Sequence, residues 1–449
     1  MALRFGTDGV RGVANDELTV ELVTALGRAA VRVLGADQPF VLGRDTRRSG
    51  PMLEAALVAG ICAEGASVVH VGVLPTPGVA FVARQRGAPG AVISASHNPF
   101  ADNGIKLLAP GGRKLTEPIE IAIEQELRAL ATEMPEPGPI GAGVGVSTEH
   151  RKALDDYVAY LVASLEGRHL TGMRVVVDCG NGAAFRAAPT ALRALGCEVD
   201  VLHAAPHGTN INADCGSTDI GDLVRAVKES GANVGLAFDG DADRVIAVDE
   251  YGMEVDGDQM LAIGALDLHD RGLLRGDAIV ATVMSNLGLR RALEAYSISV
   301  VETPVGDRKV LEALEQRNLA LGGEQSGHVI YADHATTGDG TLTGIFLLDT
   351  MVRRGRTLSE LASVMQSVPQ VLRSVAVSDP AVLNGDAAFW SRVRDVEEEL
   401  GADGRVLVRP SGTEPKVRVM VESLDAEAAE EACSRLVELV EHAAKVHGA

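Results

Sequence analysis

The stretch Phe40-Val41-Leu42-Gly43-Arg44-Asp45 opens a pattern that decides the fold. It is an apolar strand that enters a polar turn, and we expect a helix at 51–64 and a second strand at 67–73. Pro51 suits the first turn of that helix, and Gly65 suits its end. A strand, a helix and a strand in this order predict two parallel strands joined by a right-handed crossover.

The same pattern occurs twice more along the chain. In the second copy, strands are expected at 174–178 and 198–202, and the helix between them is expected to end at 195. In the third copy, strands are expected at 278–284 and 299–302, with a helix at 287–296 between them. Three copies predict three related α/β domains with mixed or parallel sheets.

The last segment has a different pattern. Strands are expected at 368–377, 405–408 and 416–422, and helices at 386–400 and 425–445, with Asp425 as an N-cap. This order predicts a C-terminal α+β domain. We therefore expect four domains around a central cleft, with the bounds 1–150, 151–252, 253–366 and 367–449. The clearest linker is Glu133–Pro139, which is rich in Pro and Gly.

The length and composition of the chain are consistent with several domains, and its charge argues against some classes of binding partner. The 449 residues are too many for one core. Aromatic residues make up only 3%, so the cores must consist of Val, Leu, Ile and Ala. A net charge of -21 argues against nucleic acid and anionic membranes as partners. An anionic small substrate remains possible, because a local cluster of Arg can bind it.

Cysteine usage and the chain ends indicate a cytoplasmic protein. The five cysteines form no CxxC pair, which argues against a disulfide framework and against a zinc knuckle. The first residues, MALRFGTDGVRG, contain no apolar core of a signal peptide. The sequence contains no run of about 18 apolar residues, so no membrane span is predicted.

The first segment that could carry chemistry is Ile93-Ser94-Ala95-Ser96-His97-Asn98-Pro99. An apolar strand ends there in a polar turn, and Asn-Pro is a turn signal. Ser96 is expected at the tip of a loop after a strand, where α/β proteins bind ligands. A turn whose Ser side chains only cap the backbone is the alternative.

The second segment, Asp239-Gly240-Asp241-Ala242-Asp243-Arg244, places three carboxylates at alternate positions after an apolar strand. Three such charges repel each other strongly unless a cation neutralises them, and hard oxygen ligands select Mg²⁺ or Ca²⁺. An EF-hand loop is disfavoured, because Arg244 stands where that loop needs Gly. A purely structural acidic turn is the other alternative.

Two further loops carry polar groups of the kind that bind phosphates and sugars. The stretch 409–418, Arg-Pro-Ser-Gly-Thr-Glu-Pro-Lys-Val-Arg, offers backbone N–H groups, hydroxyls and guanidinium groups to a phosphate. The stretch 322–328, Gly-Gly-Glu-Gln-Ser-Gly-His, offers a carboxylate, an amide and a hydroxyl to sugar hydroxyls. A hairpin turn and a plain loop are the alternatives. Arg11 and Lys106 add cations that could reach the same cleft.

Together these four loops resemble the signature loops of the α-D-phosphohexomutases. They occur in the order of that family and span nearly the whole chain. Further segments resemble the branch that acts on glucosamine phosphates, namely Arg4–Gly12, Asn98–Lys106, Cys215–Thr218, Gln325 and Thr336–Gly340. Two positions depart from that branch: Asp219 stands where His is usual, and Lys309 where an aromatic residue is expected.

The resemblance implies roles for individual residues. Catalysis is expected to involve Ser96, Lys106, His328, Arg11 and Arg244. Substrate binding is expected to involve Glu324, Ser326, Gly306, Asp307, Arg409, Ser411, Gly412, Thr413 and Arg418. The metal ligands are expected to be Ser96, Asp239, Asp241 and Asp243. Either Lys106 or His328 is expected to be the general base.

The resemblance also implies the reaction. The chain is expected to be a cytoplasmic isomerase that interconverts glucosamine 6-phosphate and glucosamine 1-phosphate, using Mg²⁺, a phosphoserine at Ser96 and a hexosamine bisphosphate intermediate. Its product is expected to feed the synthesis of UDP-N-acetylglucosamine and peptidoglycan precursors, and the chain is expected to form a homodimer. Three alternatives stay open: a mutase for mannose or glucose phosphates, a metal-dependent sugar phosphatase, and an inactive sugar-phosphate binder.

Overall fold

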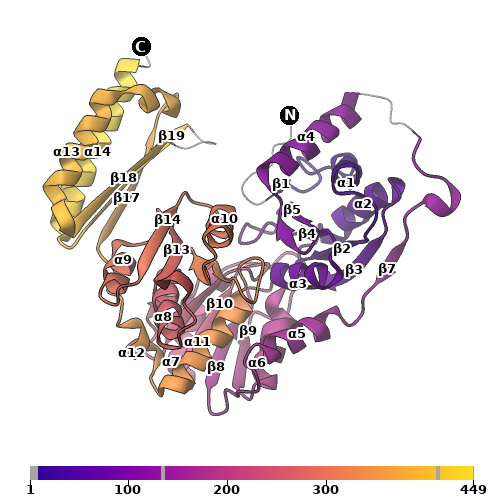
Figure 1. Cartoon of the computed structure of the whole chain (residues 1–449), viewed down its shortest axis with the longest axis horizontal. Coiled ribbons are helices and arrows are strands. Elements are labelled where there is room, and N and C mark those ends of the chain that lie inside the picture. Colours follow the sequence, from indigo (N-terminus) through magenta and orange to yellow (C-terminus); the bar gives the residue numbers. More distant parts are fainter. Residues whose placement is uncertain (1–8, 133–136, 411–414, 448–449) are drawn as a thin grey trace. The chain divides into compact units, whose positions relative to one another are not determined.

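The computed structural model describes residues 9–132, 137–410 and 415–447. The chain divides into two compact units, and each is described by itself (Figure 1). Unit 1 comprises residues up to 282 together with 300–364, and unit 2 comprises 283–299 and 365 onward. No helix in the described ranges is both long and apolar enough to span a membrane.

The first α/β domain of unit 1 is built on a seven-stranded mixed sheet. Its strands are β1 (Val10–Val13), β2 (Phe40–Arg44), β3 (Val68–Val73), β4 (Gly90–Ile93), β5 (Asp102–Ala109), β6 (Arg113–Lys114) and β7 (Ser147–Glu149), in the order β1-β5-β4-β2-β3-β7 with β6 beside β5. Its helices are α1 (Val20–Leu34), α2 (Gly50–Ala63), α3 (Thr76–Arg86) and α4 (Glu117–Thr132). The strands β4, β2, β3 and β7 are parallel to one another. The strand β5 lies between β4 and β1 and is antiparallel to both.

This domain confirms the expected strand, helix and strand. Pro51 lies in the first turn of α2, as predicted. The core between sheet and helices consists of Val, Leu, Ile and Ala, with Phe40 as its only buried aromatic residue among those described. The helices α1 and α2 approach closely at two glycines, because a Cβ on Gly60 would lie 2.0 Å from the carbonyl oxygen of Thr24.

The second domain repeats the architecture with five strands. They are β8 (Arg174–Asp178), β9 (Glu198–Leu202), β10 (Val234–Phe238), β11 (Val245–Asp249) and β12 (Glu254–Val255), in the order β12-β11-β10-β8-β9. The accompanying helices are α5 (Ala153–Ala163), α6 (Ala184–Ala194) and α7 (Gly221–Ser230). The strands β9, β8 and β10 are parallel, whereas β11 returns antiparallel to β10. The turn between β10 and β11 holds the three carboxylates.

The third sheet has four strands and completes the α/β part. Its strands are β13 (Ala278–Thr282), β14 (Ser299–Thr303), β15 (Leu321–Gly323) and β16 (Val329–Tyr331), in the order β14-β13-β15-β16. Its helices are α8 (Gly257–Asp270), α10 (Asp307–Arg317), α11 (Gly340–Arg354) and α12 (Leu358–Ala362). The order of strands and helices confirms three α/β domains of mixed sheets.

Unit 2 contains the expected α+β domain. An antiparallel sheet in the order β17-β19-β18 consists of β17 (Gln370–Ala376), β18 (Gly404–Pro410) and β19 (Lys416–Ser423). The helices α13 (Ala387–Leu400) and α14 (Ala426–His447) share one apolar core with it. Asp425 accepts a hydrogen bond from the backbone N of Glu427 at 2.9 Å, as expected of an N-cap. Unit 2 also includes α9 (Leu287–Glu294).

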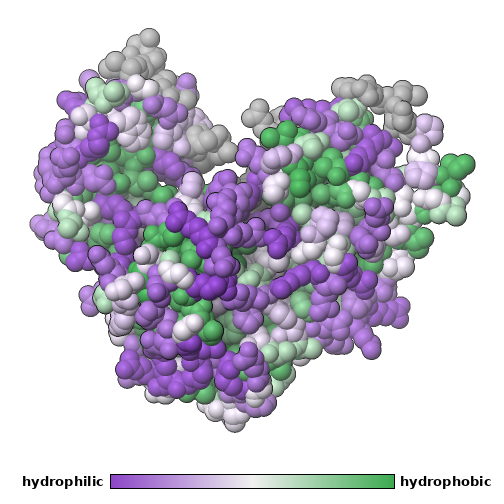
Figure 2. Space-filling view, viewed as in Figure 1, coloured by the Kyte–Doolittle hydropathy of each residue, from purple (hydrophilic) through white to green (hydrophobic). Residues whose placement is uncertain are grey.

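Five short 3₁₀ helices complete the described elements: Gly141–Gly143, Gly216–Thr218, Arg275–Asp277, Pro380–Gly385 and Gly401–Asp403. Hydrophilic side chains cover much of the visible face, in keeping with the net charge (Figure 2). Part of the expected linker, residues 133–136, lies outside the described residues. The four domain bounds stay a prediction.

Candidate active site

Ser96 lies in the loop that follows β4, and its side chain is buried. Its backbone has a φ of 53°, in the left-handed region that is costly for a residue with a Cβ. The Ser94 hydroxyl accepts a hydrogen bond from the Ser96 backbone N at 2.9 Å and donates one to Asp45 at 2.7 Å. These bonds fix the turn and direct the Ser96 hydroxyl at Asp239, to which it donates at 2.5 Å.

Arg47 is fully buried and forms hydrogen bonds to the backbone of this loop. Its guanidinium group donates to the backbone carbonyl oxygens of Ser96 and Asn98, both at 2.8 Å, and to those of Pro99 and Asp102. Its Nε donates to the Asp45 carboxylate at 2.9 Å. The sequence analysis missed Arg47 and Asp45 as site residues, although both directly follow β2 and therefore lie at the carboxyl edge of the parallel strands.

The turn after β10 brings Asp239, Asp241 and Asp243 together, and all three are buried. One carboxylate oxygen of each lies within 4.8 Å of the others. Ala242 has a φ of 56°, which is the local conformation that lets the alternate side chains converge. The Asp241 Oδ1 atom is buried and has no hydrogen-bond partner among the described residues.

Besides Ser96, two further groups of the first domain contact this carboxylate cluster. Lys106 donates to Asp241 at 2.8 Å and to Asp243 at 3.2 Å. Lys106 stands on β5 opposite Val92 of β4, so the sheet of the first domain delivers it to the same place as the Ser96 loop. Thr76, at the start of α3, donates its hydroxyl to Asp241 at 2.5 Å. Thr76 is a third residue that the sequence analysis missed.

The three carboxylates differ in how tightly they hold a proton. Burial, together with the charges of Asp243 and Asp241, raises the pKa of Asp239 well above its ordinary value. Burial alone would also raise the pKa of Asp243, but Lys106 and His328 hold it well below its ordinary value. Three buried carboxylates with an unpartnered oxygen form a set of hard ligands that fits a divalent cation such as Mg²⁺.

Three more nitrogen-bearing side chains lie around Ser96. The His97 ring nitrogen Nδ1 lies 3.2 Å from the Ser96 hydroxyl and 3.4 Å from Arg244 Nη1. Burial, and then the charges of Arg244 and Arg11, lower the pKa of His97, so its imidazole is neutral at neutral pH. Arg11 belongs to β1, opposite Gly104 of β5. Cations at this point can bind an anion on Ser96.

His328 and Glu324 lie in the loop between β15 and β16, and both are buried. His328 Nε2 accepts a hydrogen bond from the Gly338 backbone N at 3.1 Å, and its Nδ1 lies 3.8 Å from Asp243. Glu324 accepts a hydrogen bond from the Gly306 backbone N at 3.0 Å. Asp307 forms an ion pair with Lys114, and Ser326 is exposed.

The expected phosphate cradle belongs to unit 2. Arg409 and Arg418 stand opposite each other on β18 and β19. Ser411, Gly412 and Thr413 lie outside the described residues. Unit 1 thus brings together eleven of the expected site residues: Arg11, Ser96, Lys106, Asp239, Asp241, Asp243, Arg244, Gly306, Asp307, Glu324 and His328.

Comparison with known proteins matches each of the four regions in turn. Models of phosphoglucomutase/phosphomannomutase α/β/α domains I, II and III match residues 2–134, 155–252 and 256–368, and the C-terminal domain model matches 352–439. The chain belongs to the phosphoglucomutase/phosphomannomutase family. Within that family it is 51% identical over 451 residues to the phosphoglucosamine mutase of Streptomyces avermitilis, covering 99% of this chain and 100% of the relative.

Solved structures of the family show the same fold. A phosphoglucomutase/phosphomannomutase family protein of Burkholderia thailandensis is 27% identical, with a TM-score of 0.82 over 97% of both chains. The N-acetylphosphoglucosamine mutase of Aspergillus fumigatus, solved with GlcNAc-6P and magnesium, is 16% identical, with a TM-score of 0.69 over 99% of this chain and 96% of that one. At that identity the likeness concerns the fold alone.

Proposed function

We propose that this chain, an isomerase of the phosphoglucomutase/phosphomannomutase family, is a phosphoglucosamine mutase that works through a phosphorylated Ser96. The observation that carries the proposal is the contact between the buried Ser96 hydroxyl and Asp239 at 2.5 Å, beside two further buried carboxylates. The substrate assignment rests on the full-length similarity to phosphoglucosamine mutases. The reaction interconverts glucosamine 6-phosphate and glucosamine 1-phosphate.

The first half-reaction breaks the bond between phosphorus and the Ser96 oxygen and forms one between phosphorus and a sugar hydroxyl oxygen. The sugar hydroxyl loses its proton and the Ser96 oxygen gains one, so charge and atoms balance. The product is a hexosamine bisphosphate. It turns end for end and returns its other phosphate to Ser96 in the reverse of the same step.

The metal ligands are proposed to be Asp239, Asp241, Asp243 and an oxygen on Ser96, which are the residues whose oxygens meet in the structure. A bound Mg²⁺ supplies neutralisation of the charge that develops when a phosphoryl group leaves. Lys106 donates to one oxygen of Asp241 and one of Asp243, and the other oxygen of each carboxylate would be available to the cation.

Of the two proposed bases, we favour Lys106. The Nε2 lone pair of His328 already accepts the Gly338 N–H, and the ring is only 1% exposed. Lys106 Nζ lies 2.8 Å from Asp241, to which it can pass a proton, and the neutral amine that results can accept the proton of the sugar hydroxyl. A strong base is not needed if the transition state is loose. His328 then acts by holding the loop around Gly338 in place.

The remaining site residues bind rather than react. Arg11 and Arg244 are proposed to hold the oxygens of the transferring phosphoryl group. Glu324, Ser326, Gly306 and Asp307 are proposed to contact the sugar, and the proposed cradle for the non-reacting phosphate is Arg409, Ser411, Gly412, Thr413 and Arg418. The proposal of a cytoplasmic protein and of a homodimer rests on the sequence expectations alone.

The substrate is tested by measuring kcat/KM on glucosamine 1-phosphate, glucose 1-phosphate and mannose 1-phosphate with Mg²⁺ and the matching bisphosphate. We expect the highest kcat/KM on the aminosugar. A higher value on glucose or mannose phosphate would overturn the substrate assignment and leave the family intact. Release of free phosphate at the rate of substrate loss would instead indicate a phosphatase.

A further inference from the structure

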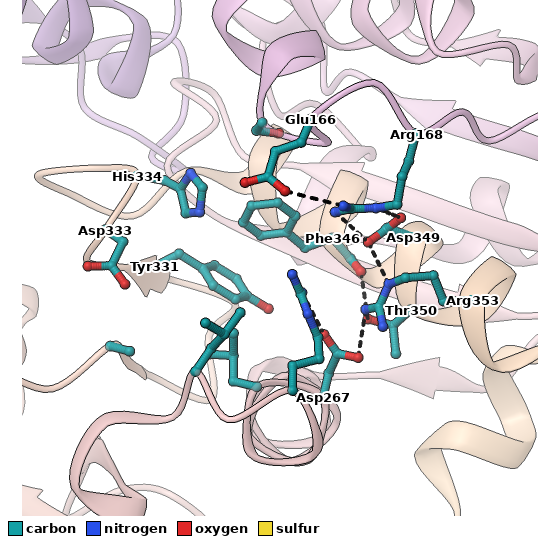
Figure 3. A pocket seen from close by; sticks show the side chains of 15 residues that line it. Glu166, Arg168, Asp267, Tyr331, Asp333, His334, Phe346, Asp349, Thr350 and Arg353 are labelled. Carbon is teal, nitrogen blue, oxygen red and sulfur yellow. Dashed lines mark hydrogen bonds and ion pairs between the residues drawn. The ribbon is translucent and has the colours of Figure 1, made fainter.

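Unit 1 contains a cavity, none of whose lining residues belongs to the proposed active site. It has a volume of about 280 Å³ and lies between α8, β16, α11 and the loop that follows α5 (Figure 3). One water needs only about 10–15 Å³, and small-molecule sites begin near 300 Å³. The cavity is therefore large enough for one ring system rather than for a few waters.

One wall of the cavity is aromatic. The side chains of Tyr331, His334 and Phe346 gather there (Figure 3). The rings of Tyr331 and His334 both meet Phe346 edge to face, with centroids 4.7 Å and 4.9 Å away. Leu268 and Leu273 add apolar surface. Such a wall favours a flat aromatic ligand, because ring contacts add attraction beyond the burial of area.

The unused polar groups of the cavity are mainly donors. Tyr331 is 9% exposed, and within the described ranges its hydroxyl has no hydrogen-bond partner. Burial and the charge of Asp267 raise the pKa of Tyr331, so the hydroxyl keeps its proton. Arg271 spends one terminal nitrogen on Asp267 at 3.2 Å, which leaves further N–H groups of that side chain for a ligand. These donors require hydrogen-bond acceptors on the ligand edge.

The acidic groups of the cavity are already paired. Asp349 accepts from Arg168 at 3.0 Å and from Arg353 at 2.8 Å. Asp267 accepts from Arg353 at 2.6 Å as well as from Arg271. Since guanidinium and carboxylate charges offset one another, the site neither attracts a strong anion nor demands a cation. His334 is neutral at neutral pH, because burial lowers its pKa, and it can accept one hydrogen bond.

We propose that this cavity is a binding site for the nucleobase of a nucleoside. A nucleobase is flat, is close to neutral, and has ring nitrogens or carbonyl oxygens for Tyr331 and Arg271 and an N–H for His334. The ring lies against Phe346, and the sugar points to the mouth of the cavity, where Leu273 and Arg271 are exposed.

The chain connects this site to the proposed active site. Residue Tyr331 ends β16, which begins directly after His328, and the loop 332–338 then leads back to Gly338, whose backbone N bonds His328. A ligand that fixes Tyr331 and His334 therefore acts on the segment that carries His328. Binding must be measured directly, because an activity assay would mix the two sites.

The test titrates the purified full chain with adenosine, guanosine, cytidine and uridine by calorimetry. We expect one-to-one binding of at least one of them, with little dependence on salt. Tyr331→Phe removes one hydrogen bond and is expected to weaken binding about fivefold. Phe346→Leu is expected to weaken it at least about threefold, because the ring contact is lost.

Tyr296→Phe, on an exposed tyrosine of unit 2, is the matched control and should bind like the parent chain. If Phe346→Leu fails to fold, Arg271→Gln replaces it; Arg271 is exposed, and Arg353 still pairs with Asp267, so we expect this variant to fold. Absence of binding by all four nucleosides would overturn the proposal. So would binding that Tyr331→Phe and Arg271→Gln leave unchanged.

Discussion

At the scale of single residues, Arg47 explains how a serine can be held in a costly conformation. Its guanidinium group bonds four backbone carbonyls of the loop and the Asp45 carboxylate, and the bonds to Ser96 and Asp45 are fully buried. Lys cannot replace it, because an ammonium group lacks the planar fork that reaches several acceptors at once. The Ser96 loop is therefore rigid before any substrate arrives.

Arg47→Met should destabilise the protein by about 3–5 kcal/mol, because it leaves the buried Asp45 carboxylate unpaired. Urea unfolding followed by circular dichroism measures the loss. Arg151→Met is the control: Arg151 is 86% exposed and pairs with Glu149, so it should cost less than about 1 kcal/mol. Equal losses in the two variants would mean that the buried pair is not what holds the loop.

Asp339, the N-cap of α11, makes stability depend on pH. Burial raises its pKa from 3.8 to about 6, although Leu342 N and the Tyr157 hydroxyl both donate to it. The folded state thus holds the proton more tightly than the unfolded state. The stability this confers is full below about pH 3.8 and is lost as the pH rises through about 6, a change of up to about 3 kcal/mol.

Asp339→Asn can still cap the helix but cannot ionise. We expect the variant to be more stable than the parent at pH 7 and to lack this part of the pH dependence between pH 4 and 6. Thermal unfolding across that range gives the comparison. A variant that is less stable at pH 7 would show that the charge on Asp339 stabilises the fold.

At the scale of elements, the sequence predicts what is local. The strands and helices of the three repeats lie within a few residues of their expected positions, because apolar runs and Pro or Gly punctuation mark them. The strand β5 was missed, since it begins with Asp102-Asn103-Gly104, which is typical of a turn. It forms because β1 and β4 pair with it on both sides. Lys106 was expected only as a cation that could reach the cleft, and it lies buried in this strand.

Gly60→Ala tests the close approach of α1 and α2. Alanine favours a helix by about 1 kcal/mol over glycine, but the new Cβ would stand 2.0 Å from the Thr24 carbonyl oxygen. We expect the clash to prevail, with a net loss of about 1–3 kcal/mol in urea unfolding. Gly385→Ala is the control, because nothing lies within 4 Å of its Cβ. A stabilised Gly60→Ala would mean that the helices can move apart without cost.

At the scale of the whole molecule, unit 2 includes the segment 283–299, which lies far from the C-terminal domain in the sequence. Glu422 of β19 is fully buried and accepts from the Leu287 backbone N at 3.0 Å, from Asn286 at 3.1 Å and from Arg405. These contacts join α9 to the C-terminal sheet. The repeat pattern predicted α9 itself. It could not predict that α9 packs with the C-terminal domain, because the hydrogen bond from Leu287 to Glu422 joins residues 135 apart.

Glu422→Ala should release that segment. The loss of a buried acceptor for three donors is expected to cost about 3–5 kcal/mol. Hydrogen exchange followed by mass spectrometry should show faster exchange at residues 283–299 in the variant. Glu399→Ala, at an exposed pair with Arg435, should leave that exchange unchanged. Unaltered protection of 283–299 in Glu422→Ala would contradict the role given to Glu422.

The four signature loops could be found from the sequence because each is a short, local pattern. The convergence of the three loops that lie in unit 1 could not be predicted, because the bond from Ser96 to Asp239 joins residues 143 apart and depends on how the sheets of unit 1 pack. Arg47 and Thr76 were not predicted for the same reason. A single Arg or Thr after a strand has no local sequence pattern that indicates which distant residue it contacts.

The most direct test of the account is the phosphorylation state of Ser96. Intact mass and peptide mapping would be recorded for the purified chain and for Ser96→Ala, before and after incubation with a hexose bisphosphate and Mg²⁺. The account predicts one phosphoryl group, on Ser96 alone, that is lost to glucosamine 6-phosphate and never appears in the variant. A chain that carries no phosphate on Ser96 after this treatment, while it still interconverts the two glucosamine phosphates, would contradict it.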